Sequence, residues 1–262
     1  MISDTKVVAI GGGTGLSTML KGLKLHTHNI TAVVTVADDG GSSGILRSDL
    51  GMLAPGDVRN CVSALAEVDP VMGELLNFRF KDGSLKGHSL GNLFLAALNE
   101  TSSSFDEAVK KFSHLAGVVG TVYPVTNESV TLSALLEDGR LIEGESHIGV
   151  HHDGPKNGIV KLMVNPEKPK AVDGVIKALE KADIIVLGPG SLYTSIIPNL
   201  LVDGVVDAIK KSNAVKIYVC NIMSQAGETE NYTVSDHLAA IERHSYEGIA
   251  DIVIANLSLI HI

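Results

Sequence analysis

Four apolar runs in this chain each end in a polar, glycine-rich segment, and this repeated pattern constrains the fold more than any other feature. The segments are residues 11–17 (GGGTGLS), 38–44 (DDGGSSG), 188–195 (GPGSLYTS) and 221–229 (NIMSQAGET). The runs before them are mostly apolar and rich in β-branched residues, which is typical of parallel strands covered by helices on both faces. Loops after the carboxyl ends of parallel strands gather at one edge of a sheet. We therefore predict an α/β fold, a Rossmann-like doubly wound and mostly parallel sheet, with a ligand site at that edge.

The segments between the strands have helical periodicity, and one region departs from it. Helices are expected at 17–21, 58–68, 71–80, 89–98, 105–115, 173–181, 195–211 and 234–244, and a last strand at 251–255. The runs 118–125, 130–136, 140–148 and 159–164 alternate or are β-branched and are separated by Asp-Gly and Asn-Gly turn signals, which favours antiparallel hairpins. We predict one α/β domain over residues 1–262 with a β-rich insertion at about 118–165.

The charge of the chain argues against two classes of partner. Lysine and arginine number 21 and aspartate and glutamate 30, a net charge of −9, so nucleic acid and anionic membrane surfaces are not expected partners. Cys61 and Cys220 lie inside apolar runs, which favours buried thiols in a reducing compartment. No apolar run is long enough to span a membrane and no signal peptide is visible at the N-terminus, so we expect a cytoplasmic protein.

The first glycine-rich segment has a direct physical use. Gly11, Gly12, Gly13 and Gly15 let the backbone approach a phosphate closely, and the helix that follows offers free N–H groups with a partial positive charge. The segment differs from the dinucleotide fingerprint G-x-G-x-x-G, because Leu16 occupies the last position, and from the P-loop, because no Gly-Lys-Ser/Thr follows. We predict a phosphate site here, with a tight turn that binds nothing as the alternative. The bend around Gly188 and Gly190 should face it.

Asp38 and Asp39 end the second predicted strand. Such a pair could bind a ribose or base, hold Mg²⁺ beside a phosphate, or act as a general base. The alternative is a turn stabilised by an aspartate side chain. If Mg²⁺ binds, Asp38 or Asp39 is its expected ligand; no catalytic residue is assigned beyond these two candidates.

Other polar residues in these segments could also contact a ligand. Arg59 could bind a phosphate, or form a surface ion pair, and Asp57 could cap the helix it begins or bind the ligand. Ser89 should cap an apolar helix, and Asn92 on that helix needs a buried partner or could contact a ligand. His88 could act as a base, but an exposed loop residue is the preferred interpretation. His147, His151 and His152 with Asp153 could suggest a metal, but exposed loop histidines are the preferred interpretation. The full set of ligand-binding candidates is Gly11, Gly12, Gly13, Thr14, Gly15, Asp38, Asp39, Ser42, Ser43, Arg59, Asn60, Ser89, Asn92, Gly188, Gly190, Ser191, Thr194, Asn221, Gln225 and Glu228.

Six motifs in this order resemble one protein family. They are GGGTGLSTMLKGLK, TVADDGGSSGILR, PGDVRNC, GHSLGNL, LGPGSLYTSIIPNLL and CNIMSQAGETENYTVSDHL, and together they resemble the YvcK/CofD family from Lys6 to about Asn256. The resemblance is closer to the YvcK-type gluconeogenesis factors, also designated UPF0052. It implies a CofD-like Rossmann fold with the site at the strand ends.

The two branches of that family imply different functions. The CofD branch transfers phospholactate to a deazaflavin with GDP-related chemistry and Mg²⁺, and its aspartate after the second strand corresponds to Asp38 or Asp39. The YvcK branch is associated with gluconeogenic growth, cell shape and peptidoglycan synthesis, and binds UDP-activated sugars such as UDP-N-acetylglucosamine. Its members usually continue several dozen residues beyond the point where this chain stops, and part of their pocket lies there. The terminal LSLIHI is unlike that continuation, so we expect a C-terminus truncated relative to the family.

Two functional hypotheses follow. The first is a cytoplasmic nucleotide-sugar-binding regulatory factor. It is expected to be a homo-oligomer, with cell-wall synthesis proteins as its partners. No cofactor beyond the nucleotide-sugar ligand is assigned to it. The second is an enzyme like 2-phospho-L-lactate transferase that uses Mg²⁺ and a nucleotide-activated phospholactate. A nicotinamide-dependent oxidoreductase is disfavoured by the imperfect fingerprint.

Overall fold

The structure, a computed structural model, describes residues 3–150 and 158–256. Six parallel strands form its main sheet in the order β3-β2-β1-β7-β8-β9. Their bounds are β1 Val7–Gly11, β2 Ile30–Val34, β3 Thr121–Pro124, β7 Ile184–Leu187, β8 Val215–Val219 and β9 Ile252–Ile254. Numbered along the chain within this sheet, the strands run 3-2-1-4-5-6, the order of a doubly wound dinucleotide-binding fold. The predicted fold class is confirmed.

Strand β1 lies at the centre because all of its residues can be buried. VVAIG has no polar side chain, and each of its five residues is buried between the helix layers. Val8 pairs with Thr31 on one side and with Ile185 on the other, so β1 is hydrogen-bonded along both edges. The carboxyl end of β1 therefore lies in the middle of the sheet edge at which the ligand site is predicted.

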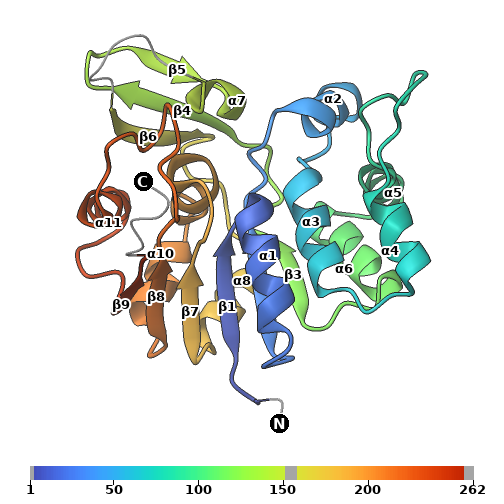
Figure 1. Cartoon of the computed structure of the whole chain (residues 1–262), viewed down its shortest axis with the longest axis horizontal. Helices are drawn as coiled ribbons and strands as arrows, with labels where there is room; N and C mark the ends of the chain where they lie inside the picture. Colours follow the sequence, from blue (N-terminus) through green and yellow to red (C-terminus); the bar gives the residue numbers. More distant parts are fainter. Residues whose placement is uncertain (1–2, 151–157, 257–262) are drawn as a thin grey trace.

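Helices cover both faces of the main sheet, with α1 in front of it and α8 behind it in Figure 1. The bounds are α1 Gly13–Leu23, α2 Gly41–Leu50, α3 Gly56–Leu65, α4 Pro70–Asn77, α5 Leu90–Glu100, α6 Phe105–Leu115, α8 Asp173–Glu180, α9 Ile197–Leu200, α10 Val205–Lys211 and α11 Val234–Arg243, with a π-helical turn, η1, at Leu192–Ile196. The helix predicted at 195–211 is therefore wrong as one element. It is divided into η1, α9 and α10, and Gly204 in the left-handed region directly precedes α10.

A second, antiparallel sheet lies above the carboxyl ends of the main strands, at the top of Figure 1. Its order is β5-β4-β6, with β4 Thr131–Leu136, β5 Leu141–Glu143 and β6 Ile159–Asn165. Two sequence predictions need correction. Residues 118–125 contain β3, a parallel edge strand of the main sheet, so the insertion begins after it. Residues 140–148 form the short β5 and a helical turn, α7, at Glu145–Ile148.

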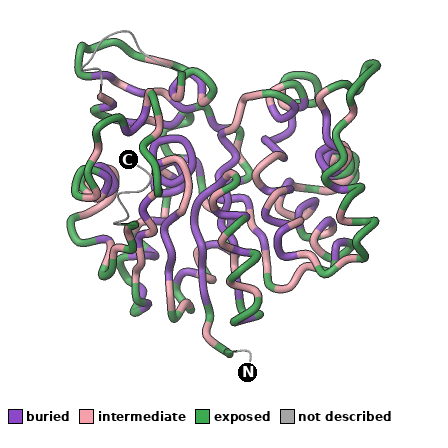
Figure 2. Tube along the Cα trace, viewed as in Figure 1, coloured by how far each residue is buried: buried purple, intermediate pink, exposed green. Residues whose placement is uncertain are grey.

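The insertion and the main sheet share one buried core. Figure 2 shows the buried trace along the central strands and the inner sides of the helices, and the core also includes Leu132, Ile148, Ile159 and Leu162 from the insertion. Cys61 and Cys220 are buried free thiols, as predicted. No helix in the described part of the chain has both the length and the apolar composition needed to cross a bilayer.

Candidate functional site

The two glycine bends meet at the point where the strand order reverses. β1 and β7 are neighbours there, and the chain leaves them in opposite directions across the sheet. A Cβ atom placed on Gly15 would lie 2.8 Å from the Pro189 carbonyl oxygen, and one placed on Gly190 would lie 3.2 Å from the Gly12 carbonyl oxygen. The approach requires glycine at position 15 and leaves little room for a side chain at position 190. Ligands of open α/β sheets bind in the crevice at this reversal.

The first bend presents the N-terminus of α1. Gly13 begins the helix with φ +65°, in the left-handed region that favours glycine. No acidic side chain occupies the first turn of α1. Because the first-turn N–H groups of a helix have no acceptor within the helix and carry a partial positive charge, those that follow Gly13 in α1 can receive an anion.

Asp57 lies against this bend instead of capping its own helix. Pro55 precedes α3, and Asp57 is the second residue of the helix, so the predicted capping role is wrong. A Cβ atom on Gly12 would lie 2.7 Å from Asp57 Oδ2, and the Gly13 N–H donates to this carboxylate. Burial, and then the Asp38 carboxylate, raise the pKa of Asp57 to about 6. The site thus contains an aspartate whose charge is costly near neutral pH.

Asp38 and Asp39 have separate roles. Asp39 accepts hydrogen bonds from the backbone N–H groups of Glu145 (2.9 Å) and Ser146 (2.8 Å), and so holds α7 over the strand ends. Asp38 accepts from the Gly40 N–H at 3.0 Å, and its other oxygen would lie 3.2 Å from a Cβ atom on Gly56. Asp38 is therefore the member of the pair that faces Asp57.

Glu145 adds another carboxylate to this region from α7. Burial raises its pKa to about 7, and the surrounding carboxylates of Asp38, Asp39, Asp57 and Glu228 contribute in that order. Four carboxylates from three other segments therefore act on Glu145 here. An anionic ligand at the glycine bends must overcome this negative potential or bring a cation with it.

The second bend is held by side chains from the loop after β8. Asn221 Oδ1 accepts from the Gly190 N–H at 3.2 Å, and Ser191 Oγ donates to Gln225 Oε1 at 2.8 Å. Glu228 accepts from the Tyr193 N–H (3.1 Å) and from Thr194 Oγ1 (3.2 Å). These predicted ligand residues come together, and their contacts position the bend.

The turn after α7 also reaches the loop after β8. A Cβ atom on Gly227 would lie 3.1 Å from the Gly149 carbonyl oxygen. With Asp39 at its start and Gly227 at its end, α7 contacts both halves of the site. The insertion therefore forms one wall of the candidate site.

A second group of predicted residues forms a separate buried network. Arg59 Nη1 donates to Asn77 Oδ1 at 2.8 Å and its Nε donates to Asn92 Oδ1 at 3.4 Å. Asn92 Nδ2 donates to Ser42 Oγ at 3.1 Å, and Ser42 Oγ is 2.9 Å from His88 Nδ1. These contacts tie Ser42, Arg59 and Asn92 to one another and to α4 and α5, not to the glycine bends.

This network corrects two expectations and confirms a third. Arg59 is buried and forms no surface ion pair; burial, and then Arg79, lower its pKa. His88 is buried, not exposed, and its ring is hydrogen-bonded to the Ser42 hydroxyl. Ser89 caps α5 as predicted and accepts from the Asn92 N–H.

Two further predicted ligand residues lie at or near α3. Asn60 is half-buried on that helix. The Ser43 hydroxyl packs against the start of α3, since its Oγ would lie 2.6 Å from a Cβ atom on Gly56.

The histidines do not form a metal site in the described chain. His147 is exposed on α7, and its Nδ1 is 2.8 Å from the Glu143 carbonyl oxygen. His151, His152 and Asp153 lie outside the described residues. Within residues 3–150 and 158–256, no three histidine, cysteine, aspartate or glutamate side chains are grouped so as to hold a metal ion.

Asn199, like Glu145, belongs to the site although it is not among the residues predicted from the sequence. Its Nδ2 donates to the carbonyl oxygens of Gly11 (3.1 Å) and Ser195 (2.7 Å), and its side chain is fully buried. It thereby connects the end of β1 to the helical turn after the second bend. The one signal was a polar residue within the apolar run SIIPNLL.

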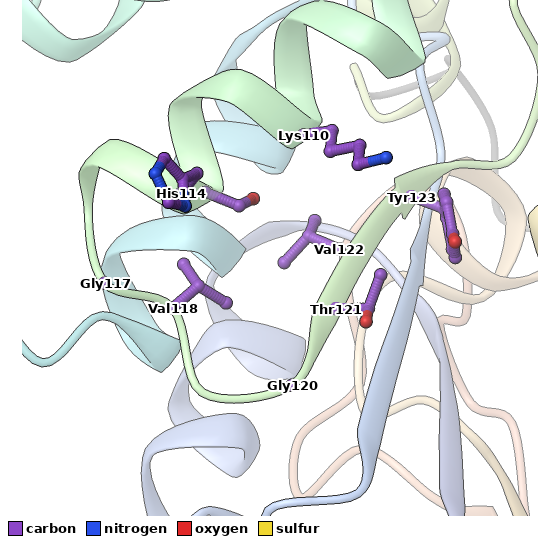
Figure 3. Close-up of a pocket in the computed structure, with 9 residues that line it drawn as sticks. Lys110, His114, Gly117, Val118, Gly120, Thr121, Val122 and Tyr123 are labelled. Carbon is purple, nitrogen blue, oxygen red and sulfur yellow. The ribbon is translucent and has the colours of Figure 1, made fainter.

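A pocket of about 330 Å³ lies elsewhere, between α6 and the edge strand β3. Figure 3 shows Lys110 and His114 on the helix above Thr121 and Tyr123 on the strand. None of its lining residues belongs to the predicted ligand set.

Known proteins share both the sequence and the fold. Residues 7–261 match the family model described as 2-phospho-L-lactate transferase CofD. A gluconeogenesis factor from Bacillus subtilis (strain 168) is 46% identical over 96% of this chain and 78% of its own length. A relative from Clostridium acetobutylicum is 52% identical over 98% of this chain, which spans only 57% of that relative's length.

A solved structure agrees with the fold over almost all of the chain. The crystal structure of a UPF0052-family protein from Bacillus halodurans has a TM-score of 0.94 and 46% identity, and the match covers 99% of this chain and 83% of that one. Since the family model and these relatives match nearly every residue, the chain belongs to the CofD family, in the branch of the gluconeogenesis factors.

Proposed function

We propose that this protein is a nucleotide-sugar-binding regulatory factor of the cytoplasm, with a UDP-N-acetylglucosamine-type ligand, that supports gluconeogenic growth, cell shape and peptidoglycan synthesis. The observation that carries the proposal is the meeting of the bends at Gly12–Gly15 and Gly188–Gly190 at the N-terminus of α1. The first-turn N–H groups of α1 that follow Gly13 suit the diphosphate of such a ligand. The N–H groups of Gly188 and Gly190 already donate within the protein, so the second bend shapes the site. Relatives named gluconeogenesis factors support the physiological role.

The carboxylates around the bends make a bridging cation part of this proposal. Mg²⁺ commonly binds through one or two carboxylates and completes its shell with phosphate oxygens and water. Asp38 and Asp57 supply such a pair, whereas both oxygens of Asp39 already accept backbone N–H groups. The oxygen donors therefore fit Mg²⁺ when a phosphate ligand is present. The ion would supply positive charge that offsets the repulsion between these side chains and the diphosphate.

Calorimetry with UDP-N-acetylglucosamine tests the proposal. We expect binding that is at least tenfold tighter with Mg²⁺ than with a chelator, since roughly 1.4 kcal/mol of relieved repulsion gives that factor. Gly15→Ala should abolish the signal, because its Cβ atom would lie 2.8 Å from the Pro189 carbonyl oxygen and force the two bends apart. The matched control is Gly22→Ala, where nothing lies within 4 Å. No heat at millimolar ligand with Mg²⁺ would remove the proposal.

A second candidate function is a transferase that moves phospholactate from a nucleotide-activated donor to a deazaflavin. It is favoured by the description of the matching family model and by the raised pKa of Asp57, about 6, which suits a general base. Incubation with a deazaflavin acceptor, an activated phospholactate and Mg²⁺ should then give a phosphorylated product that Asp57→Asn does not form. Absence of product in the wild-type reaction excludes this candidate.

A further inference from the structure

The pocket between α6 and β3 lies outside the candidate site and has a chemistry of its own. Its volume of about 330 Å³ falls within the range of small-molecule sites. Lys110, Ser113 and His114 line it from one face of α6, while the same helix buries Val109 and Phe112 in the core. The helix therefore presents its polar groups to a cavity.

The side of the pocket formed by β3 and the loop before it includes an apolar surface. Val118 and Val122 line this side together with Thr121 and Tyr123, and Val122 points from the strand toward the helix in Figure 3. Lys110 extends from α6 toward the same strand. A ligand in this pocket would thus meet aliphatic side chains on one side and an ammonium group on the other.

The ammonium group of Lys110 forms no ion pair within the described chain. The acidic residues one turn before it are engaged elsewhere, since Glu107 pairs with Lys111 at 2.9 Å and Asp106 accepts from the Asn127 amide at 2.8 Å. Within residues 3–150 and 158–256, no aspartate or glutamate lines the pocket. The positive charge of Lys110 is therefore available to a ligand.

Basic residues also line the cavity next to this pocket. That cavity, of about 310 Å³, shares the start of β3 with the pocket and is lined by Lys6, His28 and Lys181. Glu180 and Asp183 flank Lys181 in the sequence and are exposed, but among the described residues no carboxylate lines either cavity. In a chain of net charge −9, the local charge here favours an anion.

Ser113 supplies an unused hydrogen-bond donor at the wall of the pocket. Its Oγ is buried and has no partner among the described residues, which is unfavourable for a hydroxyl group. A serine hydroxyl can turn between staggered positions, so a ligand oxygen could accept this hydrogen bond. The carbonyl oxygens of Ser113 and His114 already accept the N–H groups of Val118 and Gly117, which reduces the repulsion between the end of α6 and an anion.

These groups fit a phosphate better than a carboxylate. A planar carboxylate is best matched by the fork of an arginine, and no arginine lines the pocket in the described part of the chain. A tetrahedral phosphate accepts from donors in several directions, and lysine is a common partner of it.

We propose that the α6–β3 pocket is a binding site for a small phosphate monoester. The phosphate group accepts hydrogen bonds from Lys110, His114 and Ser113. The carbon body of the ligand packs against Val118 and Val122. The proposal is independent of the function proposed above, because the pocket shares no residue with the glycine bends.

Calorimetry with phenyl phosphate, which joins a phosphate to a small apolar body, tests the site. We expect a dissociation constant of about 1 mM or below for the wild-type chain, and binding at least about tenfold weaker in Lys110→Gln. Lys111→Gln is the matched control, because it removes the same charge from the same helix at a residue that does not line the pocket. Both variants should keep the wild-type circular dichroism spectrum. No heat at about 10 mM phenyl phosphate, or equal affinity in the two variants, overturns the proposal.

Ser113→Ala separates ligand binding from folding. Because the Ser113 hydroxyl has no partner in the protein, this variant should unfold at the wild-type temperature or above it. It should nevertheless bind phenyl phosphate about three- to tenfold more weakly. Unchanged affinity would contradict the assigned donor.

Benzoate tests the chemical class of the ligand. It carries the same ring as phenyl phosphate with a planar carboxylate, and we expect the wild-type chain to bind it at least about fivefold more weakly. Equal or tighter binding of benzoate would overturn the assignment of a phosphate monoester.

Discussion

One amide group, that of Asn199, joins segments 188 residues apart at the candidate site. It donates to the Gly11 oxygen, which also accepts from the Thr35 N–H, and to the Ser195 oxygen. Its own Oδ1 has no partner among the described residues. Replacement by a side chain of similar size therefore removes donors without emptying the core.

We expect Asn199→Leu to lower the free energy of unfolding by about 1–3 kcal/mol, the cost of two lost buried hydrogen bonds. Asn199→Asp should cost more at pH 7, because a carboxylate would then face two carbonyl oxygens. Urea denaturation measures both, with the exposed Asn213→Ala as a control that should change stability by less than about 0.5 kcal/mol. Equal effects of Leu and Asp would contradict the assigned donor role.

The buried carboxyl group of Asp57 makes stability depend on pH. Its pKa is raised from 3.8 to about 6, so the folded state binds the proton more tightly than the unfolded state does. The group therefore costs nothing below pH 3.8, and its cost grows as pH rises to 6, reaching about 3 kcal/mol above it.

Asp57→Asn should accordingly stabilise the protein by about 1–3 kcal/mol at pH 8 and have little effect at pH 4. Urea denaturation at the two pH values provides the measurement, and the exposed Asp82→Asn is the control. A stabilisation that is the same at both pH values would show that charge is not its cause.

At the scale of single residues, the sequence predicts the bends better than it predicts the side chains around them. Gly13, with its left-handed φ, and Gly15, against the Pro189 carbonyl oxygen, meet backbone requirements that only glycine satisfies. The sequence left a cap and a ligand role open for Asp57, and a phosphate contact and a surface ion pair open for Arg59. A two-residue separation on α3 turns Asp57 toward Gly12 and Arg59 toward Asn77. Which neighbours a helix face meets is decided by tertiary packing, which local spacing does not contain.

Among the elements, α7 depends most on a distant residue. It has four residues, too few to be stable alone, and Asp39 accepts from its first two N–H groups. We expect Asp39→Ala to raise the rate of amide hydrogen exchange at Glu145 and Ser146 about tenfold. That factor corresponds to about 1.4 kcal/mol of lost capping free energy.

A cap elsewhere separates this effect from general destabilisation. Ser104 caps α6 by accepting from the Glu107 N–H. Ser104→Ala should speed exchange at the start of α6 and leave α7 unchanged. If both variants affect α7 alike, Asp39 has no specific role in holding it.

The elements that differ from prediction are those whose conformation depends on contacts with other parts of the chain. The β3 segment alternates in burial because it is an edge strand, and alternation also marks hairpins. Helix α2, GSSGILRSDL, has poor helix formers at its start and was not predicted; Arg47 anchors it by donating to the Ala37, Asp38 and Val130 oxygens. In contrast, β1, α5 and α6 bury continuous or periodic apolar residues, and the sequence predicts them correctly.

For the whole molecule, the shared core predicts one cooperative unfolding transition. Ala134 of β4 and Cys61 of α3 are both fully buried and belong to the same cluster. In Ala134→Cys, the new thiol and Cys61 should become reactive toward a thiol reagent at the same urea concentration. A lower midpoint for the residue 134 thiol would mean that the insertion unfolds as a separate domain.

The pairing of β1 with β7 has a consequence for synthesis of the protein. Val7 pairs with Ile30 on one edge but with Ile184 on the other. On the ribosome, at about 5–20 residues per second, the second edge of this apolar strand waits roughly 10–40 s for its neighbour. Until then the nascent chain presents an open, aggregation-prone strand edge, so we expect its yield to depend on chaperones that bind emerging polypeptides.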